Sequence, residues 1–175
     1  MSLAIQPSKG TAVITGASTG IGAIYASRLA HMGYDLIIIA RNHHRLNQMA
    51  SRITADTARN VEVLAVDLAD AQQLSVLEQK LRDDASITLL VNNAGVGTHT
   101  PLLSSDVDQM QAMINLNVVA LTRLTYSVVP GFVARGTGAV INISSIVSLA
   151  PCGPPGFLPP GPIGGIGGIT LHLLT

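Results

Sequence analysis

The fold is decided by one stretch of sequence, Thr11-Ala-Val-Ile-Thr-Gly-Ala-Ser-Thr-Gly-Ile-Gly22. Its first five residues form a short apolar run that is typical of a buried strand, and the run stops at Gly16. From Ile21 to Met32 the apolar residues recur with helical spacing. The glycines between these segments let the backbone turn sharply, so we predict a strand, a tight turn and a helix in that order.

The same alternation of strand and helix continues along the chain to about residue 143. Apolar runs predict further strands at 36–40, 61–66, 88–91 and 139–143, and helical spacing predicts helices at 21–32, 43–58, 71–84 and 105–129. Nearly continuous apolar strands with helices between them indicate a parallel sheet covered on both faces. We therefore expect an α/β fold over residues 1–150, a Rossmann-like doubly wound parallel sheet of about five strands.

The composition changes abruptly at Pro151. Residues 151–168 contain six prolines and seven glycines, and charged residues are absent from 151 to 175. Proline disrupts helices and central strands, and adjacent glycines raise the entropy cost of order. We therefore expect an irregular Pro/Gly-rich tail over 151–175. The sudden loss of charge also suggests an altered C-terminus or a changed reading frame.

The overall composition narrows the class of protein. A chain of 175 residues that is 47% hydrophobic and 11% charged suits one folded domain. A net charge of zero and the absence of Trp argue against nucleic acid as a partner. The only cysteine, Cys152, excludes an internal disulfide and a cysteine-based zinc site. We find neither a signal-peptide core near the N-terminus nor an uninterrupted apolar stretch of the ~18 residues that a membrane span needs, so we expect a cytoplasmic protein without a membrane partner.

The glycine-rich turn has the composition of a phosphate-binding site. Glycine lets a phosphate approach the backbone closely, and the N-terminus of the following helix offers free N–H groups and a positive dipole end. The hydroxyls of Ser18 and Thr19 add two possible donors. We predict that the turn binds the pyrophosphate of a dinucleotide, through Gly16, Ser18, Thr19, Gly20, Ile21 and Gly22. The alternative is a tight turn that only joins a strand to a helix.

Arg41 follows the second predicted strand and bears on which dinucleotide is bound. At this strand end an acidic residue binds the ribose 2′-hydroxyl of NAD, whereas an arginine accommodates the 2′-phosphate of NADP. No Asp or Glu occurs at 39–42, so NADP (NADPH) is favoured over NAD. A solvated surface arginine is the alternative. Arg45 could assist Arg41, but a position on the helix surface is the simpler interpretation.

Two further polar groups follow predicted strands. Asp67 could accept a hydrogen bond from an adenine amino group, with the N–H of Leu68 as donor to the ring, although an aspartate here could equally cap the next helix. The sequence Asn-Asn-Ala-Gly at 92–95 ends the fourth strand. Its small residues Asn93, Ala94 and Gly95 leave room for a ribose, and its asparagines could tie neighbouring strand ends together. Its alternative interpretation is an ordinary turn.

Together these motifs resemble those of the short-chain dehydrogenase/reductase family. The resemblance rests on TGxxxGIG at 15–22, Asp67-Leu68, NNAG at 92–95, an asparagine in the long fourth helix and Ile-Ser-Ser at 143–145, in family order and spacing. It covers roughly residues 9–150. It implies a nucleotide-binding Rossmann domain, an NAD(P) cofactor and hydride transfer between a small-molecule carbonyl and an alcohol.

The resemblance also implies catalytic residues, and here the match is incomplete. The family's asparagine and serine correspond to Asn117 and Ser145, while Asn115 lies two residues off the pattern. The family's tyrosine should lie near Leu158, with a lysine four residues later, and both are missing. No tyrosine anywhere in the chain has a lysine four residues on, and His172 is the only titratable side chain after residue 150.

The missing pair changes the expected function. In the family the tyrosine exchanges a proton with the substrate oxygen and the lysine lowers its pKa, a type of catalysis that contributes typically about 10²–10⁴-fold. We therefore expect an NADP(H)-binding oxidoreductase with impaired turnover, and the alternatives are a non-catalytic nucleotide-binding module or an unstable fragment. The resemblance further implies that the fifth strand becomes a sheet edge, and that a homo-oligomer could form through the long helix at 105–129.

Overall fold

The computed structural model describes residues 7–97, 102–144 and 171–174, the last four and Leu102 in their backbone only. Its strands are β1 (Thr11–Thr15), β2 (Asp35–Ala40), β3 (Val61–Ala65), β4 (Ile87–Asn92), β5 (Gly138–Asn142) and β6 (Leu171–Leu174). Its helices are α1 (Gly20–His31), α2 (His43–Thr57), α3 (Ala71–Asp83), η1 (Leu102–Ser104), α4 (Val107–Ile114), η2 (Asn115–Ala120) and α5 (Leu121–Arg135).

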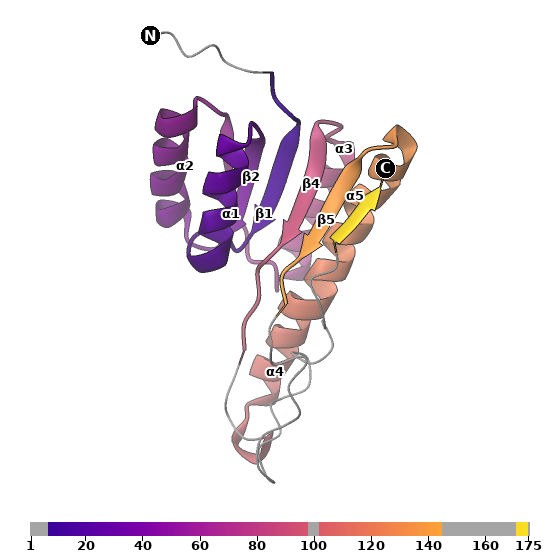
Figure 1. The fold of residues 1–175 in the computed structure, drawn as a ribbon. Helices are drawn as coiled ribbons and strands as arrows, with labels where there is room; N and C mark the ends of the chain where they lie inside the picture. The colour runs from indigo at the N-terminus through magenta and orange to yellow at the C-terminus, as the bar shows by residue number, and fades with distance from the viewer. Residues whose placement is uncertain (1–6, 98–101, 145–170, 175) are drawn as a thin grey trace.

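These strands form one twisted sheet in the order β3-β2-β1-β4-β5-β6 (Figure 1). Strands β1 to β5 pair in parallel, and the predicted α/β doubly wound fold is confirmed. The chain runs outward from β1 to β3 on one side and from β4 to β5 on the other. The strand order therefore reverses between β1 and β4, which is where ligands bind in sheets of this type.

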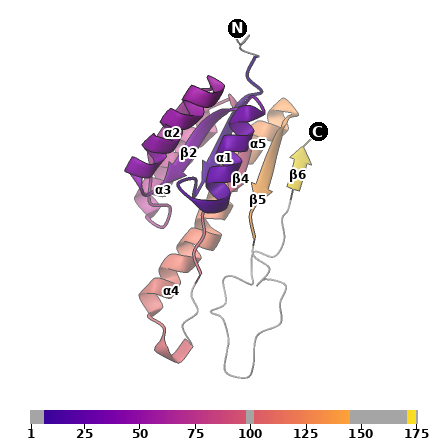
Figure 2. The ribbon, with the colours of Figure 1, turned by 60° about the vertical axis from the view of Figure 1, so that its left-hand side comes forward.

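Alternate residues of each central strand face opposite layers of the core. On β1, Val13 belongs to one apolar cluster and Ala12 and Ile14 belong to the other. The first cluster packs the sheet against α3 and α5, and the second packs it against α1 and α2. Figures 1 and 2 show the two pairs of helices on opposite faces of the sheet. Because β1 is covered on both faces, its inner residues Ala12, Val13 and Ile14 are all apolar, which explains the continuous run in the sequence.

The predicted long helix at 105–129 is shifted and longer in the structure. Helical backbone runs from Val107 through a π-helical segment, η2, to Arg135, and Pro130 lies inside it. The helix continues past the proline because Phe132, which is fully buried, packs in the core beneath it. It ends at Gly136, whose φ of 64° is the left-handed conformation that glycine adopts readily.

This helical segment is the one long apolar helix in the described part of the chain. Its 29 residues from Val107 to Arg135 would be long and apolar enough to cross a membrane, judged by length and composition alone. Core helices of soluble proteins pass the same test. Here α5 packs against α3, β4 and β5, while α4 extends beyond the carboxyl ends of the parallel strands (Figures 1 and 2).

The expectation that β5 forms the edge of the sheet is wrong. Strand β6 pairs antiparallel with it, with Gly138 opposite Leu174 and Ile141 opposite Leu171. The irregular tail expected over 151–175 is therefore interrupted by a strand, because proline and glycine are absent from 169–175 and the backbone there is free to form ladder hydrogen bonds. Residues 145–170 and Thr175 lie outside the described residues.

Candidate functional site

The glycine-rich turn leads from β1 directly into α1, as predicted. Gly16 and Gly20 have φ values of 65° and 57°, so both adopt the left-handed conformation that other residues rarely take. Thr19 is the N-cap residue of α1 and its side chain makes no capping hydrogen bond. The N–H groups of the first helical turn are therefore left to bind an external anion.

Close packing explains two of the glycines. A Cβ atom on Gly22 would collide with the carbonyl oxygen of Gly16, and one on Gly16 would lie 2.8 Å from Nδ2 of Asn93 and 2.9 Å from Cα of Ala94. A Cβ atom on Gly20 would meet nothing within 4 Å. Gly16 and Gly22 thus let the turn pack against the end of β4, whereas Gly20 is required for its backbone conformation.

Thr15 joins the turn to the Asn-Asn-Ala-Gly segment. Its Oγ1 accepts hydrogen bonds from the N–H groups of Asn93 (2.9 Å) and Ala94 (3.0 Å) and donates to the carbonyl of Val91 (3.3 Å). In return, Nδ2 of Asn93 donates to the carbonyl oxygens of Thr15 (2.9 Å) and Gly16 (3.2 Å). The expected tie between neighbouring strand ends is therefore present, but the sequence analysis missed Thr15 as its centre.

Asn92 makes a second tie, between β4, β5 and α5. Its Nδ2 donates to Oδ1 of Asn142 at 2.9 Å and to Oγ1 of Thr125 at 3.0 Å. Asn92 is only 4% exposed, and its own Oδ1 is buried without a hydrogen-bond partner in the described structure. Both asparagines of the motif thus hold the carboxyl edge of the sheet together beside the predicted ligand site.

A cavity of about 660 Å³ opens at this edge, where the strand order reverses. Its size is in the range of cofactor sites. Its walls come from the glycine-rich turn, the end of β2, the β3–α3 turn and the loop after β4. It is lined by Gly16, Ser18, Thr19, Ala40, Arg41, Asn42, Arg45, Val66, Asp67, Leu68, Asn93, Ala94, Gly95, Val96 and Leu116.

Nine of the residues predicted to bind the cofactor therefore meet around one cavity. The three that do not line it are Gly20, Ile21 and Gly22, which begin α1. Arg41, Asp67, Val96 and Leu116 also line a second cavity of about 650 Å³ beside α4, so the crevice continues toward that helix. Arg45, which the sequence suggested would lie on the helix surface, contributes to the first cavity.

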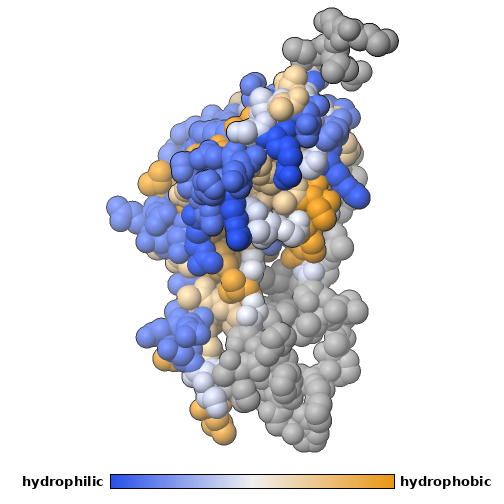
Figure 3. Space-filling view, turned by 90° about the vertical axis from the view of Figure 1, so that its left-hand side faces the viewer, coloured by the Kyte–Doolittle hydropathy of each residue, from blue (hydrophilic) through white to orange (hydrophobic). Residues whose placement is uncertain are grey.

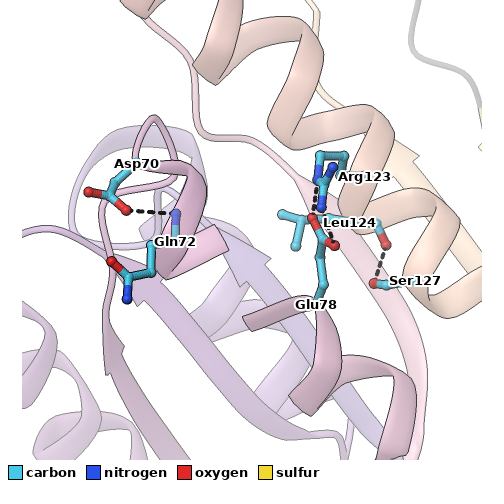
Figure 4. Close-up of polar contacts among 6 residues, drawn as sticks. All are labelled: Asp70, Gln72, Glu78, Arg123, Leu124 and Ser127. Carbon is cyan, nitrogen blue, oxygen red and sulfur yellow. Dashed lines mark hydrogen bonds and ion pairs between the residues drawn. The ribbon is translucent and has the colours of Figure 1, made fainter. Parts of the chain in front are cut away.

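Asp67 is oriented by its own turn rather than by a helix cap. One carboxylate oxygen accepts the N–H of Ala69 at 3.0 Å, and its backbone N–H donates to Oε1 of Gln73 at 2.9 Å. The N-cap of α3 is Asp70, which accepts the N–H groups of Gln72 and Gln73 at 2.9 Å (Figure 4). The alternative role of Asp67 as the cap of this helix is thus wrong, and its carboxylate is left beside the cavity.

Asn117 lies in η2 and is 7% exposed. Its Oδ1 accepts the N–H of Val96 at 3.0 Å and its Nδ2 donates to the carbonyl of Val96 at 2.7 Å. Asn115, by contrast, accepts a hydrogen bond from Gln111 on the helix surface. The geometry makes Asn117 a positioning residue that fixes the loop after Gly95, because both the oxygen and the nitrogen of its side-chain amide bond to that loop.

The remaining predicted catalytic residue, Ser145, lies outside the described residues. None of the three tyrosines lines the cavity, and Tyr126 is 75% exposed on α5. Of the two lysines, Lys80 pairs with Glu62 at 2.9 Å and Lys9 precedes β1. The cavity thus has polar groups for holding a ligand, but no tyrosine or lysine among its described lining residues.

Comparison with known proteins identifies the family. The family model described as short chain dehydrogenase matches residues 10–153. The chain is 32% identical to a very-long-chain 3-oxoacyl-CoA reductase of Anas platyrhynchos, over 85% of this chain and 49% of the relative. It is 34% identical to an inactive hydroxysteroid dehydrogenase-like protein 1 of Homo sapiens, over 77% of this chain and 41% of the relative.

A solved structure gives the same result. The short-chain dehydrogenase from Sphingobium yanoikuyae in complex with NADPH superimposes with a TM-score of 0.82 and 41% identity, covering 89% of this chain and 59% of that one. The chain spans about half the length of the curated relatives it matches. With the family model, the relatives and the shared fold in agreement, the chain belongs to the short-chain dehydrogenase family of oxidoreductases.

Proposed function

We propose that the chain binds NADP(H) in the cavity at the carboxyl edge of the sheet, in preference to NAD(H). The observation that carries the preference is Arg41, which follows β2, is exposed and lines the cavity where no acidic residue stands at 39–42. An arginine at this point suits a 2′-phosphate, and an acidic residue would suit a free 2′-hydroxyl. The relative solved with NADPH supports the same choice.

The residues of the cavity fit this cofactor. The uncapped N-terminus of α1 and the hydroxyls of Ser18 and Thr19 would hold the pyrophosphate. Asp67 and Leu68 would hold the adenine, and the segment from Asn93 to Gly95 would hold a ribose. A bound nicotinamide supplies or accepts a hydride at the carbon of a carbonyl or an alcohol.

We further propose that turnover is impaired. The chain has no tyrosine followed four residues later by a lysine, although the expected position near Leu158 lies within it. Without a proton donor at the substrate oxygen, the rate of carbonyl reduction should be roughly 10²–10⁴-fold lower than that of an enzyme with the Tyr–Lys pair. Ser145 would still bind a substrate oxygen, and Asn117 would still position the loop after Gly95.

The second candidate function is a nucleotide-binding module without turnover. It is favoured by the same absence of the Tyr–Lys pair, and by similarity to a human relative that is named inactive. An unstable fragment is the third possibility. In all three cases we expect a cytoplasmic chain without nucleic-acid or membrane partners. Any homo-oligomer would form through the long helix, whose exposed side chains include Val118, Val119 and Tyr126.

Fluorescence titration of the full chain with NADPH and with NADH tests the proposal. We expect saturable binding of both dinucleotides. The dissociation constant for NADPH should be at least about tenfold lower than that for NADH, because a charge-assisted contact to the 2′-phosphate contributes a free energy of that size. Equal affinities would contradict the preference for NADP. If neither dinucleotide binds saturably, the unstable fragment is the one of the three interpretations that remains. A carbonyl-reduction assay then separates the first two functions, since turnover that depends on Ser145 in a Ser145→Ala comparison would contradict the non-catalytic module.

A further inference from the structure

The second cavity, of about 650 Å³, lies between the β3–α3 turn and α4, beside the cavity proposed for the cofactor. The two cavities share Arg41, Asp67, Val96 and Leu116, so they are neighbouring parts of one crevice. The glycine-rich turn lines the first cavity and not the second. A dinucleotide whose pyrophosphate lies at that turn therefore leaves the second cavity for another ligand, and its volume is in the range of small-molecule sites.

One wall of this second cavity is apolar. It includes Met110 and Met113 on α4, together with Val96 and Leu116. Met113 is only 3% exposed, and methionine side chains adapt to ligands of different outline. Figure 3, which views the molecule from the side of α2, shows apolar surface between the hydrophilic side chains of the upper part and those of α4. The wall thus suits an apolar ring or chain.

The charged groups of the second cavity are mostly acidic. Its lining contains two carboxylates, Asp67 and Asp106, and one cation, Arg41. Asp106 is the N-cap of α4, and one of its carboxylate oxygens accepts the N–H groups of Asp108 (2.8 Å) and Gln109 (3.2 Å). These bonds leave its second oxygen unused. Neither carboxylate of the cavity takes part in the ion pairs that the described residues form.

Cofactor binding would make this charge more negative. Arg41 also lines the first cavity, where the proposed function places it beside a 2′-phosphate. A phosphate monoester carries about −1.5 to −2 charges near neutral pH, so it would neutralise the arginine. The N-terminus of α4 adds only about half a positive charge. The two carboxylates then exceed the remaining positive charge, and a protonated amine would be favoured over an anion.

We infer that the second cavity binds a small amphipathic cation, an apolar ring or chain that carries a protonated amine, beside bound NADP(H). The inference rests on the proposed function. The apolar part of the ligand would lie against Met110 and Met113, and its ammonium group would lie near Asp106. Because the bound phosphate neutralises Arg41, NADPH should strengthen binding of the cation, and the cation should strengthen binding of NADPH by the same factor.

The test is calorimetric titration of the full chain with naphthylethylamine and with naphthylacetate, which share a ring system and carry opposite charges. Each is titrated into the chain saturated with NADPH and into the chain saturated with NADH. With NADPH we expect the amine to bind about tenfold more tightly than the acetate. With NADH, which lacks the 2′-phosphate, the ratio should fall below about threefold.

Three variants locate the binding site. Asp106→Asn removes the charge and keeps the helix cap, because asparagine caps as well as aspartate. It should weaken amine binding by about three- to fivefold and leave the affinities for naphthylacetate and NADPH within about twofold. Asp108→Asn is the matched control, since Asp108 lies in the same helical turn and does not line the cavity. Met110→Trp fills the cavity and should abolish binding of both naphthyl compounds.

Four results would overturn the inference. If the amine and the acetate bind equally to the NADPH-loaded chain, charge does not select the ligand. If neither binds while NADPH does, the cavity takes no such ligand and the proposed function stands. If amine binding survives both Asp106→Asn and Met110→Trp unchanged, the compound binds elsewhere. If NADPH itself does not bind, the proposed function fails and the inference fails with it. Should Asp106→Asn unfold the chain, Met110→Trp and the comparison of amine with acetate in the unmodified chain decide the question.

Discussion

At the scale of single residues, Thr15 connects the glycine-rich turn to the fourth strand. It is 2% exposed, so its hydroxyl is shielded from water. This hydroxyl accepts hydrogen bonds from the backbone N–H groups of both Asn93 and Ala94. These two residues line the cavity, and Asn93 in turn donates to the carbonyl oxygens that begin the turn. One hydroxyl thus fixes the two walls of the cavity relative to each other.

We expect Thr15→Val to destabilise the chain by roughly 1–3 kcal/mol, because valine has nearly the same shape but leaves two backbone N–H groups without their acceptor. Dinucleotide affinity should fall with it, since the turn and the loop after β4 would no longer be held in register. Thr15→Ser is the control, because it keeps the hydroxyl. Urea denaturation and NADPH titration measure both effects. Equal stability of the valine and serine variants would show that the hydroxyl makes no net contribution.

At the scale of elements, α3 and α5 are joined by one ion pair on the face of the sheet opposite α1. Nε and Nη2 of Arg123 both donate hydrogen bonds to the carboxylate of Glu78 (Figure 4). The distance from Nη2 to Oε2 is 2.9 Å. Hydrogen bonding and charge attraction from Glu78 raise the pKa of Arg123 above its already high usual value. The stability linked to this raised pKa is therefore fully present below the usual pKa of arginine and is lost as the pH rises through the pKa of the folded state.

Arg123→Met should lower the melting temperature, because Glu78 is only 7% exposed and would remain nearly buried without its cation. Adding Glu78→Met should restore much of the loss by removing the unpaired charge. Lys80→Met is the matched control on α3, since Lys80 and Glu62 form an ion pair whose side chains are 40% and 45% exposed. Thermal unfolding followed by circular dichroism measures all three. A double variant less stable than Arg123→Met would contradict this account.

The elements also show where sequence periodicity predicts well and where it does not. Strands β1 to β5 and the first three helices appear within about one or two residues of their predicted ends, because the apolar pattern of each follows the part of it that is buried. The helix predicted at 105–129 was extended to Arg135, because burial of Phe132 outweighs the break that Pro130 suggests. The π-helical segment η2 was not predicted, because it differs from an α-helix in its backbone hydrogen bonds, which the apolar pattern does not report.

At the scale of the whole molecule, the sequence predicted the cavity better than the contacts inside it. The motifs locate strand ends, and parallel strands bring those ends to one edge, so Arg41, Asp67 and Asn93 meet there as expected. The role of Thr15 and the position of Arg45 depend on side-chain directions, which spacing alone does not give. The pairing of β6 with β5 was missed because a short strand after a Pro/Gly-rich segment carries little periodicity.

This pairing leads to a prediction about association of the whole chain. Strand β6 occupies the outer hydrogen-bonding edge of β5, from Gly138 to Ile141. Deleting residues 171–175 should leave that edge unpaired, and an unpaired apolar edge strand is a template for pairing with another chain. We expect the deleted form to self-associate in light scattering and size-exclusion chromatography at concentrations where the full chain does not. Deleting only Thr175, which leaves all four residues of β6, should have no such effect. Unchanged size after removal of β6 would mean that the edge of β5 is protected by something other than this strand.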